Sequence, residues 1–190
     1  MKKIFSLLLL FFPLLGFGQV EFNGIRVGET FEITSKKLQE KGFVKKMDQA
    51  NVVGWEGVFS GKTGKVYTVT TPNSGFVWKL VVIPETHTSW SSAKLAVQKY
   101  VQILSQKYGE VKDGFYYFKS PYEEGDGYEM LALKSDKWVC FYTWEISGAT
   151  ISLELTSHKY GEAQIQISYE DGETSKINRE EKSKIDQNTF

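Results

Sequence analysis

The chain of 190 residues has little of the chemistry by which an enzyme is recognised from its sequence. It contains one cysteine, Cys140, and two histidines, and its acidic and basic side chains are equal in number. One cysteine cannot close a disulfide within the chain, so the fold must be stabilised by packing. A net charge of zero provides no basic surface for nucleic acid or an anionic membrane. We therefore expect no nucleic-acid partner.

Motifs of the common catalytic and cofactor sites are also missing. The chain has no GxSxG nucleophile elbow, no GxxxxGK[ST] phosphate loop and no glycine fingerprint for dinucleotides. His87 and His158 lack the HExxH spacing, and no second cysteine can complete a zinc site. We expect His87 to lie at a helix entry and His158 in a turn. The sequence therefore assigns no catalytic residue, no metal site and no cofactor, and the protein is predicted not to be an enzyme.

The first residues have the pattern of a cleaved export signal. Lys2 and Lys3 precede an apolar run over residues 4–15, and residues 16–18 form a small-x-small cleavage site. A retained membrane anchor is the alternative, but a spanning helix needs about 20 apolar residues. We expect residues 1–18 to be removed, and no cysteine follows the cut for lipid attachment. The mature protein is then periplasmic or secreted, without a membrane span.

Two helices are expected in the mature chain. The first begins near Thr30 and ends at Gly42, which can adopt the left-handed conformation of a helix stop. The second follows the capping residue Ser89 and ends at Gly109. One apolar stripe marks its buried face: Ala93, Val97, Tyr100, Val101, Leu104 and Tyr108.

Turn residues separate the expected strands. The strands are residues 52–60, 65–71, 76–83, 114–118, 128–134, 137–146, 149–157 and 163–169. This order predicts an α+β fold, in which an antiparallel sheet meander carries helices packed on one face. We expect a single domain over residues 19–170, and a degenerate tandem α-β-β-β repeat with halves at 19–86 and 87–170 fits the order. The polar tail, 171–190, is compatible with a frayed helix or with disorder.

The register of the last strands places Cys140 in the core. Ser147 and Gly148 form a natural two-residue hairpin loop. The resulting register opposes Trp144 and Ile151, Tyr142 and Leu153, and Cys140 and Leu155. Because residues 150–156 alternate between apolar and polar, the side of the sheet with Leu155 is the core side. A buried cysteine behaves as a small apolar side chain.

Two neighbouring turns are expected to extend this register. A Ser135–Asp136 loop would pair Leu131 with Cys140. A Lys159–Tyr160–Gly161 loop would keep Leu155 opposite Ile165 and Leu153 opposite Ile167, with Gly161 left-handed.

Aromatic side chains are abundant, and they provide the candidate binding residues. Phe141 falls on the sheet face opposite the core, beside Glu154, and Tyr128 is expected on the next strand. An antiparallel sheet with helices on one side leaves its other face in water, where rings in a polar frame suit contact with protein or sugar. The alternative is that strands simply favour aromatic residues. The candidate ligand-binding residues are Phe141, Tyr128, Glu154, Tyr122 and Tyr160.

The carboxylates give a weaker signal. Glu123, Glu124, Asp126 and Glu129 gather in one segment, and Glu170, Asp171 and Glu173 in another. Neither segment has the alternating spacing of a calcium loop. A glycosidase would need two carboxylates facing each other across a cleft. Solvated turns are the simplest interpretation.

The segment FNGIRVGETFEITSKKLQEKGF, the export signal, the long helix ending in KYG and the closing strand meander resemble small exported bacterial proteins of the beta-lactamase-inhibitor-like kind. This resemblance implies helices on one face of an antiparallel sheet, often in tandem. That family typically carries disulfides, which this chain cannot form, and none of its binding residues can be transferred to this sequence.

Three functional hypotheses follow. The first is a non-catalytic, exported binding module that recognises an envelope or secreted protein through its exposed sheet face. The second is a glycan-binding module that uses aromatic side chains. The third, and the weakest, is an envelope hydrolase that uses the acidic turns.

Overall fold

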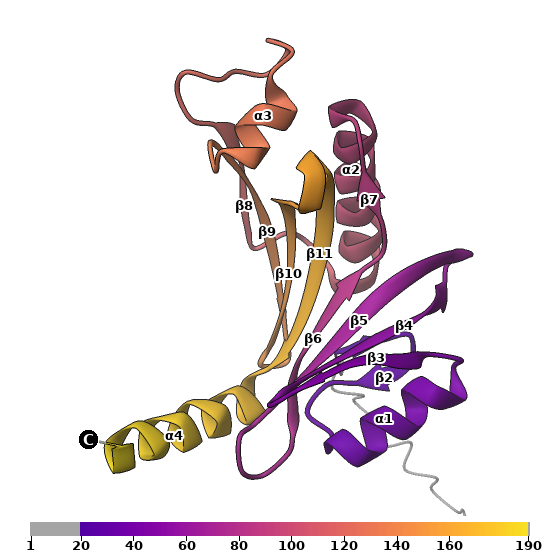
Figure 1. Cartoon of the computed structure of the whole chain (residues 1–190), viewed down its shortest axis with the longest axis vertical. Helices are drawn as coiled ribbons and strands as arrows, with labels where there is room; N and C mark the ends of the chain where they lie inside the picture. The colour runs from indigo at the N-terminus through magenta and orange to yellow at the C-terminus, as the bar shows by residue number, and fades with distance from the viewer. Residues whose placement is uncertain (1–19, 190) are drawn as a thin grey trace, which may run out of the picture.

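A computed structural model describes residues 20–189 and shows an α+β fold built on a nine-stranded antiparallel sheet (Figure 1). The helices α1 and α2 lie on the same side of this sheet, as the sequence predicts. The expected export signal, residues 1–18, lies outside the described residues. No helix in the described range is long and apolar enough to cross a membrane.

The elements follow one another in this order: β1 (Glu21–Phe22), β2 (Ile25–Arg26), α1 (Phe31–Glu40), β3 (Val44–Gln49), β4 (Val52–Phe59), β5 (Lys62–Thr70), β6 (Val77–Ile83), β7 (Thr86–His87), α2 (Trp90–Tyr108), β8 (Asp113–Phe118), α3 (Glu129–Lys134), β9 (Trp138–Ile146), β10 (Ala149–Ser157), the 3-10 turn η1 (Lys159–Gly161), β11 (Ala163–Asp171) and α4 (Gly172–Thr189).

Two consecutive units of similar order make up the sheet. The strand order is β3-β4-β5-β6-β11-β10-β9-β8, with β7 beside β11, so the final strands of the two units, β6 and β11, meet in the middle. Each unit is a helix followed by four strands of the sheet, whereas the sequence predicted three strands in the first unit and five in the second. The extra strand of the first unit is β3, whose segment VKKMDQ has no apolar alternation because it forms a solvated edge.

The ends of the two main helices are those that the sequence predicts. Ser89 caps α2, since its Oγ accepts from the backbone N–H of Ser92 at 3.4 Å. Gly42 and Gly109 follow the helices with φ of +81° and +92°, a conformation that costs glycine little. Thr30 precedes α1, but its side chain makes no capping hydrogen bond.

The hairpin between β9 and β10 has the predicted register. Ser147 and Gly148 have φ of +50° and +80°, as a two-residue hairpin loop of type I′ requires. The ladder opposes Ile146 and Ala149, Trp144 and Ile151, and Tyr142 and Leu153. The pairings expected on the other side of β10, Leu155 with Ile165 and Leu153 with Ile167, are also present.

The segment expected to be a strand over residues 128–134 is instead a helix. In α3, Ala132 and Leu133 are buried. The prediction was wrong because Glu, Met, Leu, Ala and Lys, which make up the segment EMLALK, are all strong helix formers, and none of them is β-branched. The neighbour of β9 is β8, so Cys140 lies opposite Tyr116 rather than Leu131.

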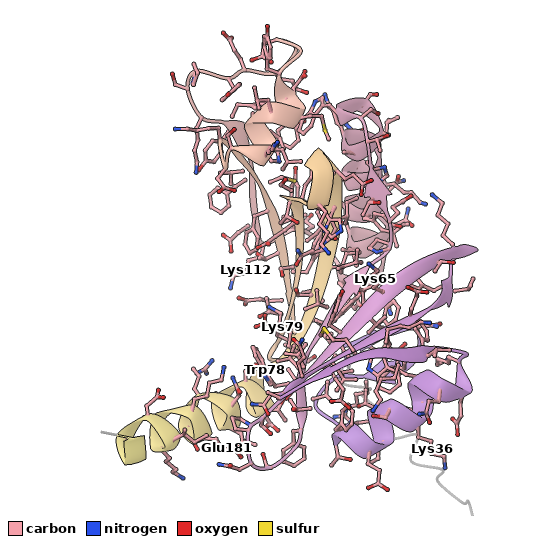
Figure 2. All side chains as sticks on the ribbon, in the orientation of Figure 1. Lys36, Lys65, Trp78, Lys79, Lys112 and Glu181 are labelled. Atoms are coloured by element: carbon pink, nitrogen blue, oxygen red, sulfur yellow. The ribbon has the colours of Figure 1, made fainter. Side chains whose placement is uncertain are left out.

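The polar tail forms the helix α4, one of the two states compatible with its sequence. Its first turns carry three buried polar residues, Thr174, Ser175 and Asn178. Further along, a carboxylate oxygen of Glu181 accepts from the backbone N–H of Asn73, at 2.7 Å, in the loop before β6 (Figure 2). The remainder of α4 projects away from the sheet (Figure 1).

Candidate functional site

Four apolar side chains form a block on the sheet face opposite α1 and α2. Phe115 of β8 lies opposite Phe141 of β9, and Tyr117 lies opposite Val139 in the next row but one. Phe115 is 50% exposed and Tyr117 is 48% exposed, whereas Phe141 and Val139 are partly buried. We call this block the aromatic face. It lies at the edge of the sheet, because β8 is the last strand in the order.

The sequence of β8 forces two rings onto this face. Tyr116 and Phe118 point to the core side, where their rings contact Trp138 with centroid distances of 4.5 and 4.4 Å. Successive side chains of a strand point to opposite faces, so Phe115 and Tyr117 must point outward. A run of four aromatic residues in an edge strand therefore fills the core and also exposes two rings.

Polar residues frame the aromatic face on its inner side. Glu154 of β10 lies opposite Phe141, and Gln166 of β11 lies opposite Glu154. The Gln166 side-chain amide donates to Thr156 Oγ1 at 3.2 Å. The predicted position of Phe141, beside Glu154, is thus present.

A cavity of about 260 Å³ opens between β9 and β10 next to this frame. The ladder between the two strands ends at the pair Phe141–Glu154, although both strands continue, so the strands separate beyond it. The cavity is lined by Leu133, Asp136, Trp138, Val139, Cys140, Phe141, Glu154, Leu155, Thr156 and Ser157.

Cys140 is a core residue, as its register predicts. It is 5% exposed, and burial raises the pKa of its thiol to about 12. The backbone N–H of Leu155 favours the thiolate and offsets part of this shift, while the charge of Glu154 adds to it. The thiol is therefore protonated near neutral pH and is a poor nucleophile.

The three tyrosines among the predicted binding residues do not belong to the ladder rows of the aromatic face. Tyr128 comes just before α3 and is 61% exposed, and it does not lie on the strand expected there. Tyr122 is partly buried in the loop after β8. Tyr160 lies in η1, and its side chain is outside the described part of the chain. The sequence missed Phe115 and Tyr117, although residues 114–118 were expected to be a strand, because the neighbour of that strand was misassigned.

Neither a family profile, nor a curated protein, nor a solved structure matches this chain.

The carboxylates of the loop before α3 stabilise that loop. Asp126 accepts from the backbone N–H groups of Glu123 and Tyr128, at 3.0 and 2.7 Å. Glu129 accepts from the Gly125 backbone N–H at 2.9 Å. Glu124 pairs with Lys94 of α2, and the hydrogen bond from Lys94 holds the pKa of Glu124 below its usual value. These contacts fit the interpretation of the acidic segment as a turn.

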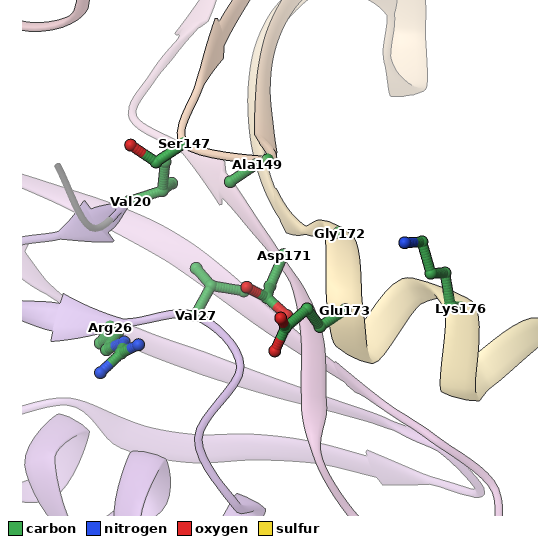
Figure 3. Close-up of a pocket in the computed structure, with 10 residues that line it drawn as sticks. Val20, Arg26, Val27, Ser147, Ala149, Asp171, Gly172, Glu173 and Lys176 are labelled. Carbon is green, nitrogen blue, oxygen red and sulfur yellow. The ribbon is translucent and has the colours of Figure 1, made fainter. Parts of the chain in front are cut away.

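A second, larger cavity of about 460 Å³ lies where α4 begins (Figure 3). Two acids and two bases are among its lining residues: Asp171, Glu173, Arg26 and Lys176. Asp171 Oδ1 accepts from the backbone N–H and the Oγ1 of Thr174, so this carboxylate caps α4. Within residues 20–189, no group of three or more His, Cys, Asp or Glu side chains is arranged to hold a metal ion.

A small polar cluster that the sequence did not predict joins β5, β7 and α2. Glu85 pairs with Lys62 and accepts from the hydroxyl of Tyr100 at 3.2 Å. Burial raises the pKa of Glu85, but the hydrogen bonds and the charge of Lys62 outweigh it and leave this pKa lowered. Burial lowers the pKa of the nearby His87. The cluster links the end of the first unit to the long helix.

Proposed function

We propose that the protein is an exported, non-catalytic binding module that recognises another envelope or secreted protein through the aromatic face. The observation that carries this proposal is the pair of half-exposed rings, Phe115 and Tyr117, on the same edge of the open face as Phe141 and its polar neighbour Glu154. Exposed rings next to polar groups are typical of the anchors that dominate binding energy in protein interfaces. The export pattern in residues 1–18 supports a partner outside the cytoplasm.

The rest of the open face provides a contrast. Its centre carries Ser152 and Ser168, which lie opposite each other, and the apolar residues that continue this row, Val81 and Tyr67, are partly buried. The exposed aromatic rings of this face are therefore concentrated at the edge formed by β8 and β9. Val58 of β4 is also an exposed apolar residue, at 63%, but it lies in the other unit of the fold. It serves as a control for unspecific apolar contact.

Affinity capture tests this proposal. The tagged mature protein is incubated with an envelope extract, alongside variants with Phe141→Ala and Val58→Ala. We expect a stoichiometric protein in the eluate of the wild type and of Val58→Ala, and a large loss with Phe141→Ala. Equal capture by Phe141→Ala, with an intact fold, would show that the partner binds elsewhere.

Glycan binding is a second candidate, favoured by the cavity beside the aromatic face. Phe141, Glu154 and Thr156 are among the residues that line this cavity, and sugars are bound by rings and hydrogen-bonding groups of this kind. Retention on immobilised polysaccharide that is lost in Glu154→Ala would favour this function. Absence of retention together with capture of a protein would exclude it.

A further inference from the structure

The two edges of the sheet differ in how they are protected. The edge strand β3 carries Lys45 and Lys46, and charged residues of this kind discourage pairing with another chain. The other edge strand, β8, has the sequence DGFYYF, with no lysine or proline inside it. An edge of this composition is suited to accept a further strand.

The backbone of β8 fixes which groups face the free edge. The backbone N–H of Lys119 donates to Lys137 O at 2.8 Å, in continuation of the β8–β9 register. Hydrogen bonds alternate along an antiparallel strand, so odd-numbered residues bond to β9. The N–H and C=O groups of Gly114, Tyr116 and Phe118 therefore point away from β9.

We propose that β8 pairs with β8 of a second copy of this chain, in an antiparallel register centred on Tyr116. The free hydrogen-bonding groups belong to even-numbered residues, and paired residues must lie on the same face of the sheet. Even-numbered residues must therefore lie opposite even-numbered residues of the second copy. In the register centred on Tyr116, Asp113 lies opposite Lys119 of the second copy, and the twofold axis repeats this pair. Centring one residue earlier or later instead places Asp113 opposite Tyr117 or Pro121.

The same register joins the two aromatic faces. Asp113, Phe115, Tyr117 and Lys119 alternate onto the open face, so Phe115 of one copy lies opposite Tyr117 of the other, twice. Each copy thus completes the aromatic face of its partner at the edge where that face would otherwise end. The use of this joined face for binding rests on the proposed function. The pairing itself is measured with no other protein present, so the two proposals can fail separately.

The charges at the ends of β8 are available for this pairing. Asp113 and Lys119 are both exposed. Asp113 accepts from Thr143 Oγ1 at 3.4 Å, and the Lys119 ammonium donates to the carbonyl of Asp136 at 3.4 Å. Both contacts are long, and neither neutralises the charge. The neighbouring Lys112 also interacts with the charge of Asp113, but its ammonium pairs with Glu145.

Sedimentation equilibrium of the purified mature chain, over a range of concentrations, tests the pairing. We expect a dimer, with dissociation constants about tenfold higher for Asp113→Lys and for Lys119→Asp, because each change replaces two symmetric attractions by repulsions. An equimolar mixture of the two variants should dimerise as the wild type does, since opposite charges then meet at both ends. Asp48→Lys, the same charge reversal on β3, is the matched control and should leave the dimer unchanged.

Two results would overturn the proposal. One is a wild type that remains monomeric at all concentrations. The other is a dimer that neither single variant weakens, or that the mixture of variants fails to restore, because the interface would then lie on another surface. Circular dichroism of each variant confirms that it is folded.

Discussion

Phe115 of the edge strand β8 lies directly opposite Phe141 of β9, on the sheet face that α1 and α2 do not cover. Tyr116 and Phe118, the core-side residues of β8, already fill the space around Trp138. The rings of Phe115 and Phe141 therefore lie outside the core. The Phe115–Phe141 pair therefore results from the packing of the edge strand, and it belongs to the aromatic face that we propose for binding. The same alternation that completes the core also produces the aromatic face.

The first prediction concerns export. Intact-mass measurement of the protein recovered from the periplasm or medium should give residues 19–190, because the small-x-small site precedes Gln19. A mature species that still carries residues 4–15 would contradict the localisation on which the choice of partner rests.

The second prediction concerns the reactivity of Cys140. A thiol reagent at pH 8 should label it slowly in the native protein and quickly in denaturant, because the side chain is 5% exposed and its thiol is protonated. Cys140→Ala should lower the free energy of unfolding by about 1 kcal/mol, as a small cavity does. Rapid labelling of the folded protein is the result that would contradict the buried position.

The same thiol makes stability depend on alkaline pH. In the folded protein its pKa is raised to about 12, whereas in the unfolded chain it should be near its ordinary value of about 8.5. Between these values the unfolded chain binds fewer protons, so the free energy of unfolding falls as the pH rises, by at most about 1.4 kcal/mol per unit. Urea unfolding at pH 8, 9 and 10 measures this. The free energy of unfolding of Cys140→Ala should depend less on pH than that of the wild type. Equal slopes for the two proteins would contradict the assignment of this pH dependence to Cys140.

Another prediction tests the junction between α4 and the β9–β10 hairpin. A Cβ atom at Gly172 would lie 2.0 Å from the carbonyl oxygen of Gly148, which is backbone and cannot rotate away. Gly172→Ala should therefore destabilise the fold by about 1–3 kcal/mol, as overpacking does. Glu173→Ala, at the next residue, is exposed and should change stability by less than about 0.5 kcal/mol. Equal unfolding midpoints for the two variants would place the start of α4 elsewhere.

Local signals in the sequence predicted most of the elements. The loop residues Ser147 and Gly148 fixed the β9–β10 register, because a two-residue turn leaves one pairing. Thr30 and Gly42 predicted the limits of α1, and Ser89 and Gly109 predicted those of α2. The register of this hairpin also predicted that Cys140 is buried and that Phe141 lies beside Glu154.

Non-local pairing could not be predicted in the same way. The strand β8 reaches β9 across the loop and helix between them, and no turn residue specifies that contact. The short loop at residues 135–136 instead suggested a hairpin with a strand before it. Residues 129–134 form a helix because their intrinsic helix propensity is high. The exposed rings Phe115 and Tyr117 were missed for this reason.

The central claim is that the aromatic face binds a partner, and the most direct test is the affinity of the captured partner measured by titration calorimetry. Phe141→Ala should raise Kd by about 5- to 30-fold, or about 1–2 kcal/mol, while Val58→Ala leaves Kd unchanged. Phe141→Ala should also remain folded, unlike Trp144→Ala, which removes a ring with 0% exposure and should cost about 3–5 kcal/mol of stability. A folded Phe141→Ala variant that binds the partner as tightly as the wild type would contradict the account.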